Sequence, residues 1–215
     1  GGVDEHLTNV IDHITSATRR LNEVVEAVIN ISLIDSEQLE LVRKPVDLAS
    51  MTQSIVADLQ PVVKQRALQL IVGDLSHVPT LSGDPNYLRR AIVNLLDNAI
   101  KYTPDGGTIK LEARPETEAI HLVVADTGIG IDRAEQDRIF DKFYVLEDTQ
   151  FHSTSRNNFL GGGFGLGLAV AHGIIRAHGG RIWVESEGLD TARLPGSRFH
   201  VLLPLTPPPA NPVTT

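Results

Sequence analysis

The segment that most constrains the fold lies near the middle of the chain, at residues 84–107, and it carries a long helical pattern. Asp84 and Pro85 supply an N-cap and a proline at the first helical position, and the turn residues 104–107 end the helix. The helix predicted between them has about eighteen residues, above the usual mean of about twelve. Its apolar residues recur at three- and four-residue steps and predict a buried stripe: Leu88, Ile92, Leu95, Leu96 and Ala99.

Another face of the same helix is polar. Arg90, Asn94, Asn98 and Lys101 recur at the same helical spacing, so they share one side. Amide oxygens are hard ligands suited to magnesium, which usually keeps several waters and takes further ligands from substrate phosphates. A lysine is a mobile point charge suited to phosphate. The pattern also fits an ordinary solvated helix face, so the interpretation depends on the rest of the chain.

The other segments alternate between helical and strand patterns. Helices are expected at residues 4–35, 48–66 and 135–143, and from the glycine run 161–168 to about 178. Asp47 is the expected cap of the second helix, whose inward residues are Met51, Ile55, Leu59 and Val62. Strands are expected at 68–72, 78–81, 108–113, 120–125, 181–186 and 197–203. This order predicts a two-layer α/β sandwich, with one mixed sheet and helices on one face.

The chain divides into three predicted regions. Residues 1–44 form a helix and a polar linker, residues 45–205 a compact domain, and residues 206–215 a tail. The N-terminal helix carries a widened heptad seam that includes Leu7, Ile14, Leu21 and Val28, which suits a four-helix bundle. So wide an apolar stripe favours packing against another chain over packing on its own domain.

Composition excludes several classes of function. The net charge of −8 argues against a nucleic-acid partner, although a nucleotide needs only a local cluster of donors. No run of about eighteen apolar residues and no signal peptide is visible, so this piece is expected to make no membrane contact. There is no cysteine, which fits the cytoplasm.

Two glycine-rich segments complete the candidate site. Asp126 ends a predicted strand, and Gly128 and Gly130 follow it. Its carboxylate can accept a hydrogen bond from the amino group of a ring, and the glycines let a planar ligand lie against the backbone. An ordinary Asp-Gly turn is the alternative interpretation of these residues. Five glycines within residues 161–167 precede a helix, where bare N–H groups bind anions. A flexible linker is the alternative, but a linker would not normally lead into an amphipathic helix.

Two common nucleotide motifs are absent from the sequence. It contains no Gly-x-x-x-x-Gly-Lys-[Ser/Thr], so the chain is not a P-loop protein. No early strand carries Gly-x-Gly-x-x-Gly with an acidic residue about twenty positions later, so a dinucleotide fold is not indicated.

Four segments together resemble a known family. Residues 94–104, Asn-Leu-Leu-Asp-Asn-Ala-Ile-Lys-Tyr-Thr-Pro, resemble the N box of sensor histidine kinases. Residues 126–130 resemble the first glycine box, Phe-Asp-Lys-Phe at 140–143 the F box, and residues 161–168 the second glycine box, all in the family's order. The resemblance implies the left-handed, Bergerat-type ATP-binding sandwich shared with type II topoisomerases, mismatch-repair ATPases and heat-shock chaperones.

The resemblance implies roles for the N box and the first glycine box. Asn98, with Asn94 beside it, should coordinate a magnesium ion that bridges the ATP phosphates. Lys101 should contact a phosphate, and Tyr102 the ring or the ribose. Asp126 should accept a hydrogen bond from the adenine amino group.

The resemblance also implies a lid at about residues 144–162. Gly128 and Gly130 should shape the adenine site. Gly163, Gly165 and Gly167, with Leu166 between them, should hinge the lid and offer N–H groups to phosphate. Lys142 of the F box stands where arginine is common and is included among the ATP contacts, while Val145 stands where a second arginine is frequent.

The implied activity is transfer of the ATP γ-phosphoryl group to a histidine, for relay to a response regulator. Residues 4–43 resemble the second helix of the family's dimerisation and phosphotransfer hairpin, which implies a homodimer of the full-length protein. Neither His6 nor His13 lies in the family's His-Glu-x-x-x-Pro context, so the acceptor helix is expected to be absent and no catalytic residue is assigned.

Two alternatives stay open at this stage. One is an ATP-hydrolysing clamp of the topoisomerase or chaperone kind, which needs a general base on the helix that bears the asparagines. Asp97 is the only acidic residue nearby. The other is a module that binds nucleotide without catalysis.

Overall fold

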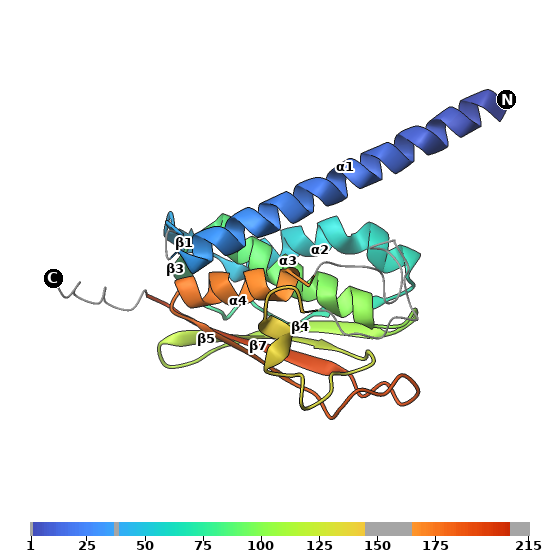
Figure 1. Cartoon of the computed structure of the whole chain (residues 1–215). Helices are drawn as coiled ribbons and strands as arrows, with labels where there is room; N and C mark the ends of the chain where they lie inside the picture. Colours follow the sequence, from blue (N-terminus) through green and yellow to red (C-terminus); the bar gives the residue numbers. More distant parts are fainter. Residues whose placement is uncertain (1, 37–38, 145–164, 207–215) are drawn as a thin grey trace. The chain divides into compact units, whose positions relative to one another are not determined.

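The computed structural model describes residues 2–36, 39–144 and 165–206. The chain forms two compact units, residues 1–39 and 40–215 (Figure 1). The first unit contains one helix, α1 (Gly2–Asp35), where a helix over residues 4–35 was predicted. Large apolar side chains of α1 are exposed, among them Ile11, Ile14, Leu21 and Val25.

The second unit is built on a five-stranded sheet in the order β2-β4-β5-β7-β6. The strands are β2 (Gln69–Val72), β4 (Thr108–Pro115), β5 (Ala119–Asp126), β6 (Arg181–Glu185) and β7 (Ser197–Pro204). β2 and β4 pair in parallel and the other neighbours are antiparallel, so the sheet is mixed. The register places Asp126, the last residue of the central strand β5, between Ile109 and Ser197.

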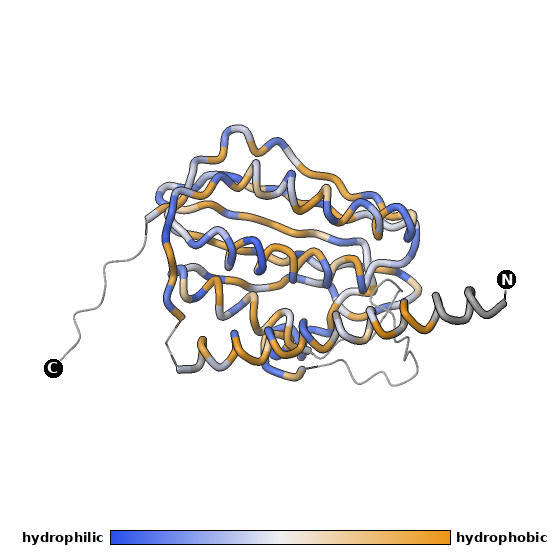
Figure 2. The backbone as a smooth tube through the Cα atoms, turned by 90° about the horizontal axis from the view of Figure 1, so that it is seen from above, coloured by the Kyte–Doolittle hydropathy of each residue, from blue (hydrophilic) through white to orange (hydrophobic). Residues whose placement is uncertain are grey.

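Three helices cover one face of this sheet: α2 (Leu48–Gln65), α3 (Pro85–Tyr102) and α4 (Gly167–Ala177) (Figure 1). Hydrophobic stretches recur along these helices and the strands (Figure 2). The residues of the core between the two layers are almost fully buried: Leu88, Leu95, Leu96, Ile109, Leu111, Ile120, Leu122, Ile174 and Phe199. The predicted two-layer α/β sandwich is therefore confirmed.

The ends of α3 are defined as the sequence predicted. Asp84 accepts hydrogen bonds from the N–H groups of Asn86 and Tyr87 at 3.0 and 3.3 Å, and Pro85 is the first helical residue. These bonds satisfy donors that the first helical turn leaves free. The buried stripe of α3 contains all the predicted residues and adds Ala91 and Ile100.

Three predicted elements differ from the structure. Lys44, predicted as the end of a linker, is the first residue of β1 (Lys44–Val46), which pairs antiparallel with β3 (Leu81–Gly83) in a separate two-stranded sheet. The strand predicted at 78–81 therefore begins only at Leu81. β1 contains Pro45, which is tolerated because both strands of a two-stranded ribbon are edge strands.

The helix predicted at residues 135–143 is reduced to one 3₁₀ turn, η1 (Arg138–Phe140). Tertiary packing accounts for its shortness, because Ile139 is buried and the Phe140 ring lies 5.5 Å from the His172 ring and 6.4 Å from the Phe199 ring. The chain turns to place these two side chains in the core. A longer helix would not be needed for that contact.

The buried face of α2 is rotated from the predicted one. Ile55 is buried as expected, but Met51, Leu59 and Val62 are half-buried. The other buried residues are Leu48, Thr52 and Val63. The helix is apolar over a wide arc, so residue spacing alone did not identify the centre of the buried face.

Candidate nucleotide site

The polar face of α3 forms one side of the candidate site. Asn94, Asn98, Lys101 and Tyr102 are all half-buried, whereas Leu95 between them is fully buried. The four-residue spacing places the two amides on successive turns of one face. Nζ of Lys101 lies 4.7 Å from the centroid of the Tyr102 ring, so the lysine charge is held at the C-terminal end of this face.

Gly167, the last glycine of the run, meets this face as the first residue of α4. A Cβ atom added at Gly167 would lie 3.6 Å from Oδ1 and 3.7 Å from Cγ of Asn94. The first residue of α4 therefore lies beside the Asn94 amide. The first N–H groups of a helix lack intrahelical partners and carry a partial positive charge, so this arrangement suits an anion next to the amide.

Asp126 lies at the end of β5 in a half-buried position. Its Oδ1 accepts a hydrogen bond from the Gly128 N–H at 2.8 Å. Burial raises the pKa of the Asp126 carboxyl from 3.8 to about 6, although backbone hydrogen bonds from Gly128 and Ser197 oppose the rise. A buried acceptor with a perturbed pKa is typical of a functional site.

The loop after Asp126 packs directly on the end of α3. The Ile129 N–H donates to the Tyr102 carbonyl at 3.2 Å, and a Cβ atom at Gly128 would overlap that carbonyl oxygen. Gly130 has φ +75°, and a side chain there would overlap the Gly188 carbonyl. The structure thus brings the Asp126 segment and the Tyr102 end of α3 into contact.

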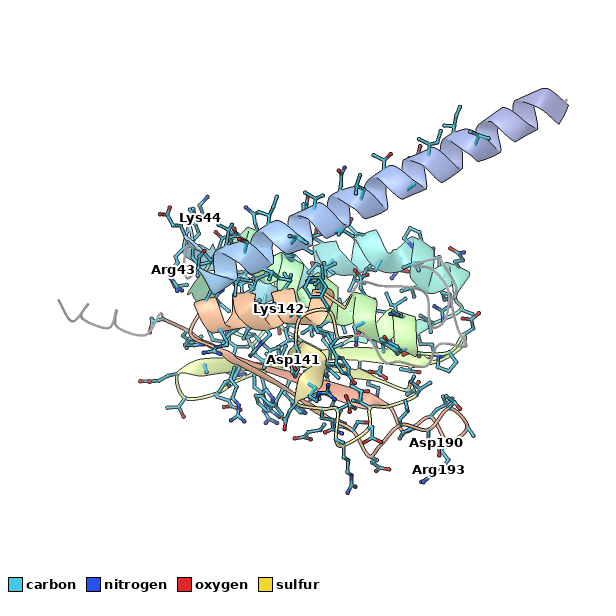
Figure 3. The ribbon with its side chains drawn as sticks, in the orientation of Figure 1. Arg43, Lys44, Asp141, Lys142, Asp190 and Arg193 are labelled. Carbon is cyan, nitrogen blue, oxygen red and sulfur yellow. The ribbon has the colours of Figure 1, made fainter. Side chains whose placement is uncertain are left out.

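The two described ends of the predicted lid also meet. Gly165 has φ +67°, and a Cβ atom there would overlap the Tyr144 carbonyl oxygen. Leu166, the residue before α4, is buried. Gly163 and lid residues 145–162 lie outside the described residues. Lys142, which follows η1, is exposed (Figure 3).

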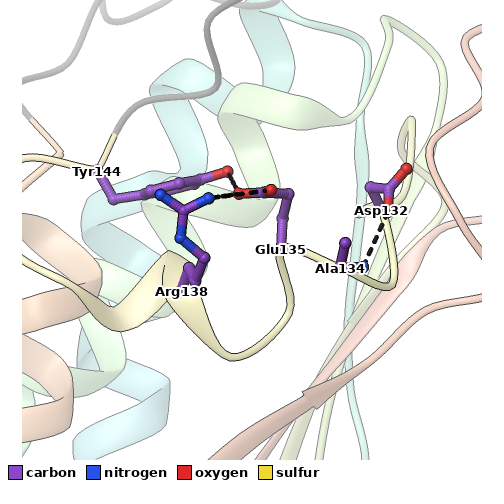
Figure 4. Close-up of polar contacts among 5 residues, drawn as sticks. All are labelled: Asp132, Ala134, Glu135, Arg138 and Tyr144. Atoms are coloured by element: carbon purple, nitrogen blue, oxygen red, sulfur yellow. Dashed lines mark hydrogen bonds and ion pairs between the residues drawn. The ribbon is translucent and has the colours of Figure 1, made fainter.

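A cluster of three side chains where the chain enters the lid was not predicted (Figure 4). Nη1 of Arg138 donates to both carboxylate oxygens of Glu135 at 3.2 Å, and the Tyr144 hydroxyl donates to the same carboxylate. The Arg138 guanidinium lies 5.5 Å from the centroid of the Tyr144 ring. The three-residue spacing of Glu135 and Arg138 was a usable signal for the ion pair, but nothing local indicated Tyr144.

Arg66, which follows α2, was not predicted as a functional residue; it is buried and contacts the end of α3. No motif includes it, and its buried position follows from the tertiary fold. Arg66 is the last residue of the helix predicted at 48–66, and an arginine at a helix end is ordinarily expected in solvent.

The oxygen ligands at this site suit a magnesium ion that is also coordinated by phosphate. Among the described residues, no group of three or more His, Cys, Asp or Glu side chains could hold a metal ion. Asn94 and Asn98 offer two half-buried amide oxygens, which fits an ion that takes its other ligands from phosphates and water.

The mixed sheet with helices on one face forms a two-layer sandwich that brings Gly128 and Gly167 against α3. Residues 83–207 match the model of the histidine kinase-, DNA gyrase B- and HSP90-like ATPase family, and the chain belongs to this family. Together with the sensory kinases described next, this match confirms the resemblance to sensor histidine kinases. Among the described residues, no helix is sufficiently long and apolar to cross a membrane.

Several kinases are similar to this chain. The adaptive-response sensory kinase SasA of Synechococcus sp. (strain JA-3-3Ab) is 34% identical over 91% of this chain and 48% of its own length. The chain thus spans about half the length of the curated relatives it matches.

Two solved structures extend this comparison. Full-length ShkA in complex with AMPPNP has a TM-score of 0.74 and 25% identity, covering 90% of this chain and 37% of that one. The histidine kinase ThkA in complex with the response regulator TrrA has a TM-score of 0.67 and 22% identity, covering 94% of this chain and 52% of that one. At 22% identity, the similarity to ThkA supports the fold alone.

Proposed function

We propose that this chain is the ATP-binding catalytic portion of a sensor histidine kinase, which transfers the γ-phosphoryl group of Mg-ATP to a histidine. One observation carries the proposal: α3 contacts both glycine segments, through Asn94 beside Gly167 and Tyr102 beside Gly128. A site with this arrangement can hold the adenine base beside the Gly128 segment and the phosphates beside Gly167 at the start of α4. The AMPPNP bound to ShkA supports this assignment.

The proposed roles follow the geometry of the site. The Asp126 carboxylate accepts a hydrogen bond from the adenine amino group. Gly128 and Gly130 shape the adenine site by letting the loop after Asp126 pack closely against the Tyr102 and Gly188 carbonyls. Lys101 contacts a phosphate, Tyr102 the ribose or ring, and the start of α4 presents N–H groups to the phosphates. Lys142, Gly163, Gly165 and Leu166 complete the proposed set as lid and hinge residues.

Asn98 and Asn94 are the proposed magnesium ligands. When bound, the ion supplies charge neutralisation for the phosphates. The chain's own contribution is to hold the nucleotide in line with an acceptor nitrogen, which requires no covalent protein nucleophile. The ThkA–TrrA complex supports a response regulator as the partner that receives the phosphoryl group.

Replacing Asn98 with alanine tests the magnesium role. We expect ATP affinity to fall by roughly tenfold or more with magnesium, because an amide ligand is lost, and by less than about twofold when magnesium is chelated. Calorimetric titration under both conditions measures the difference. Asn86→Ala, at an exposed asparagine of the same helix, is the matched control. Equal losses with and without magnesium would show that Asn98 is structural.

The proposed homodimer is tested on the N-terminal helix. The seam residues Ile14 and Leu21 are 61% and 63% exposed, so we expect self-association of α1 through them and Val28. Leu21→Glu should shift the chain toward monomer in sedimentation, since it places a charge in the seam. The adjacent exposed Asn22→Glu lies off the seam and should leave association unchanged. A wild-type monomer at high concentration contradicts the proposal.

A further inference from the structure

Arg66 is a buried charge outside every recognised motif. It is the C-cap residue of α2, and its side chain is only 4% exposed. A buried guanidinium needs partners for its donors, because an unpaired charge in the interior is costly. Nη2 donates to the Thr103 carbonyl at 2.8 Å, Nη1 to the Ile100 carbonyl at 3.3 Å, and Nε to Oδ1 of Asp105.

These bonds hold the C-terminal end of α3. The last carbonyls of a helix lack intrahelical partners and carry a partial negative charge, so a cation there is favourable. Ile100 and Thr103 stand on either side of Lys101 and Tyr102 in the chain. The planar fork of one guanidinium therefore fixes the backbone on both sides of the two residues proposed to contact phosphate and ribose.

The turn after α3 is held by the same arginine. The Gly106 N–H donates to the Arg66 carbonyl at 3.2 Å, and the Gln69 N–H donates to the Gly107 carbonyl at 2.9 Å. A Cβ atom at Gly107 would overlap the Thr103 side chain and lie 3.1 Å from Oγ1 of Thr127. The turn is thus packed between the end of α3 and the residue that follows Asp126.

The segment 101–103 is consequently fixed from two directions. Arg66 binds it from the α2 side, through the carbonyls of Ile100 and Thr103. The Ile129 N–H binds the Tyr102 carbonyl from the side of the first glycine segment. Loss of the first restraint would remove the side-chain bonds to the backbone on both sides of Lys101 and Tyr102, and would leave the Ile129 bond on the side of the proposed adenine contact.

We propose that Arg66 is a positioning residue for nucleotide binding. It sets the distance of Lys101 from Asp126, and so the fit between the phosphate and base ends of the site. This inference rests on the proposed function, because it requires that the chain bind ATP through these residues. Arg66 itself touches no nucleotide and acts through Lys101.

A double-mutant cycle tests this role. Arg66→Lys keeps the charge and most of the length but loses the fork, so we expect ATP affinity to fall about fivefold or more. In a Lys101→Ala background, the same change should have less than about twofold effect, because the residue through which it acts is gone. If the affinity losses of the two single variants multiply in the double variant, the proposal is overturned and Arg66 contributes to the fold alone.

The chain offers a matched control and a second variant. Arg89 of α3 pairs with Asp58 of α2 near the other end of α3, and its side chain is 34% exposed. Arg89→Lys should leave ATP affinity within about twofold of the wild type. Asp105→Ala removes a 67% exposed partner and frees Nε of Arg66, so it tests the role if Arg66→Lys fails to fold.

The outcomes separate this inference from the proposed function. Asp105→Ala should weaken ATP binding about two- to threefold, and only while Lys101 is present. A wild type that binds ATP, with Arg66→Lys and Asp105→Ala unchanged in affinity, overturns the positioning role alone. A wild type that binds no ATP overturns the proposed function and this role together.

Discussion

Replacement of Gly128 with alanine is expected to weaken ATP binding by a factor of roughly ten to a thousand. The added Cβ atom would overlap the Tyr102 carbonyl oxygen, which also accepts the Ile129 hydrogen bond. Overpacking costs about 1–3 kcal/mol and a lost hydrogen bond about 0.5–1.5 kcal/mol. The strain lowers affinity when it is relieved by displacing the loop from α3. Each 1.4 kcal/mol then corresponds to about a tenfold loss of ATP affinity.

Calorimetric titration with ATP measures this loss, and thermal unfolding shows whether the variant remains folded. Gly73→Ala is the matched control, because a Cβ atom there would approach its neighbours no closer than 3.4 Å. It should bind ATP as the wild type does. A folded Gly128→Ala variant with wild-type affinity would show that the contact between the loop and α3 is not needed for the nucleotide.

Asp126→Asn is expected to have opposite effects on binding and on stability. Oδ1 accepts from the Gly128 N–H, so the amide nitrogen would take the other position and present a donor to the adenine amino group. That mismatch costs about 1–3 kcal/mol of binding, or roughly five- to 150-fold. Without nucleotide, ionisation of Asp126 opposes folding above pH 6, so the neutral asparagine should raise the free energy of unfolding at pH 7.

The raised pKa gives both effects a pH dependence. The folded-state pKa of about 6 lies above the ordinary aspartate value of 3.8, so the stabilisation from the protonated carboxyl is present at low pH and lost as pH rises through 6. Nucleotide binding follows the reverse course, because the carboxylate is the acceptor, and it should weaken below pH 6.

Titrations of wild type and Asp126→Asn at matched pH values cancel the titration of the nucleotide itself. The wild type should lose affinity between pH 7 and pH 5 relative to the variant, by at most about tenfold per pH unit below 6. Identical pH profiles for the two proteins, or a variant less stable than the wild type at pH 7, would contradict the assignment of Asp126.

Local signals account for the parts of the fold that were predicted. Asp84, Pro85 and the turn after Tyr102 mark both ends of α3, and the apolar period identifies its buried face. Asp126 was assigned to a strand end because apolar residues precede it and glycines follow. Each of these features depends on residues within a few positions of one another, where spacing carries the information.

The remaining features depend on contacts between distant segments. β1 exists because Lys44–Val46 pairs with Leu81–Gly83, and no pattern within residues 39–46 indicates that partner. Arg66 is buried because the end of α3 supplies carbonyls for its guanidinium. The contact between Gly167 and Asn94 requires α4 to pack beside α3, which the order of elements does not specify.

The central claim is that this face of α3 and the Asp126 segment form a magnesium-dependent site for an adenine nucleotide. Calorimetric titration with ATP and with GTP, each in excess magnesium, tests it most directly. Asp126 presents an acceptor, which suits the adenine amino group and repels the carbonyl oxygen of guanine. We expect one-to-one binding of ATP, with GTP weaker by roughly tenfold or more. Equal affinity for the two nucleotides, or no binding of either, would contradict it.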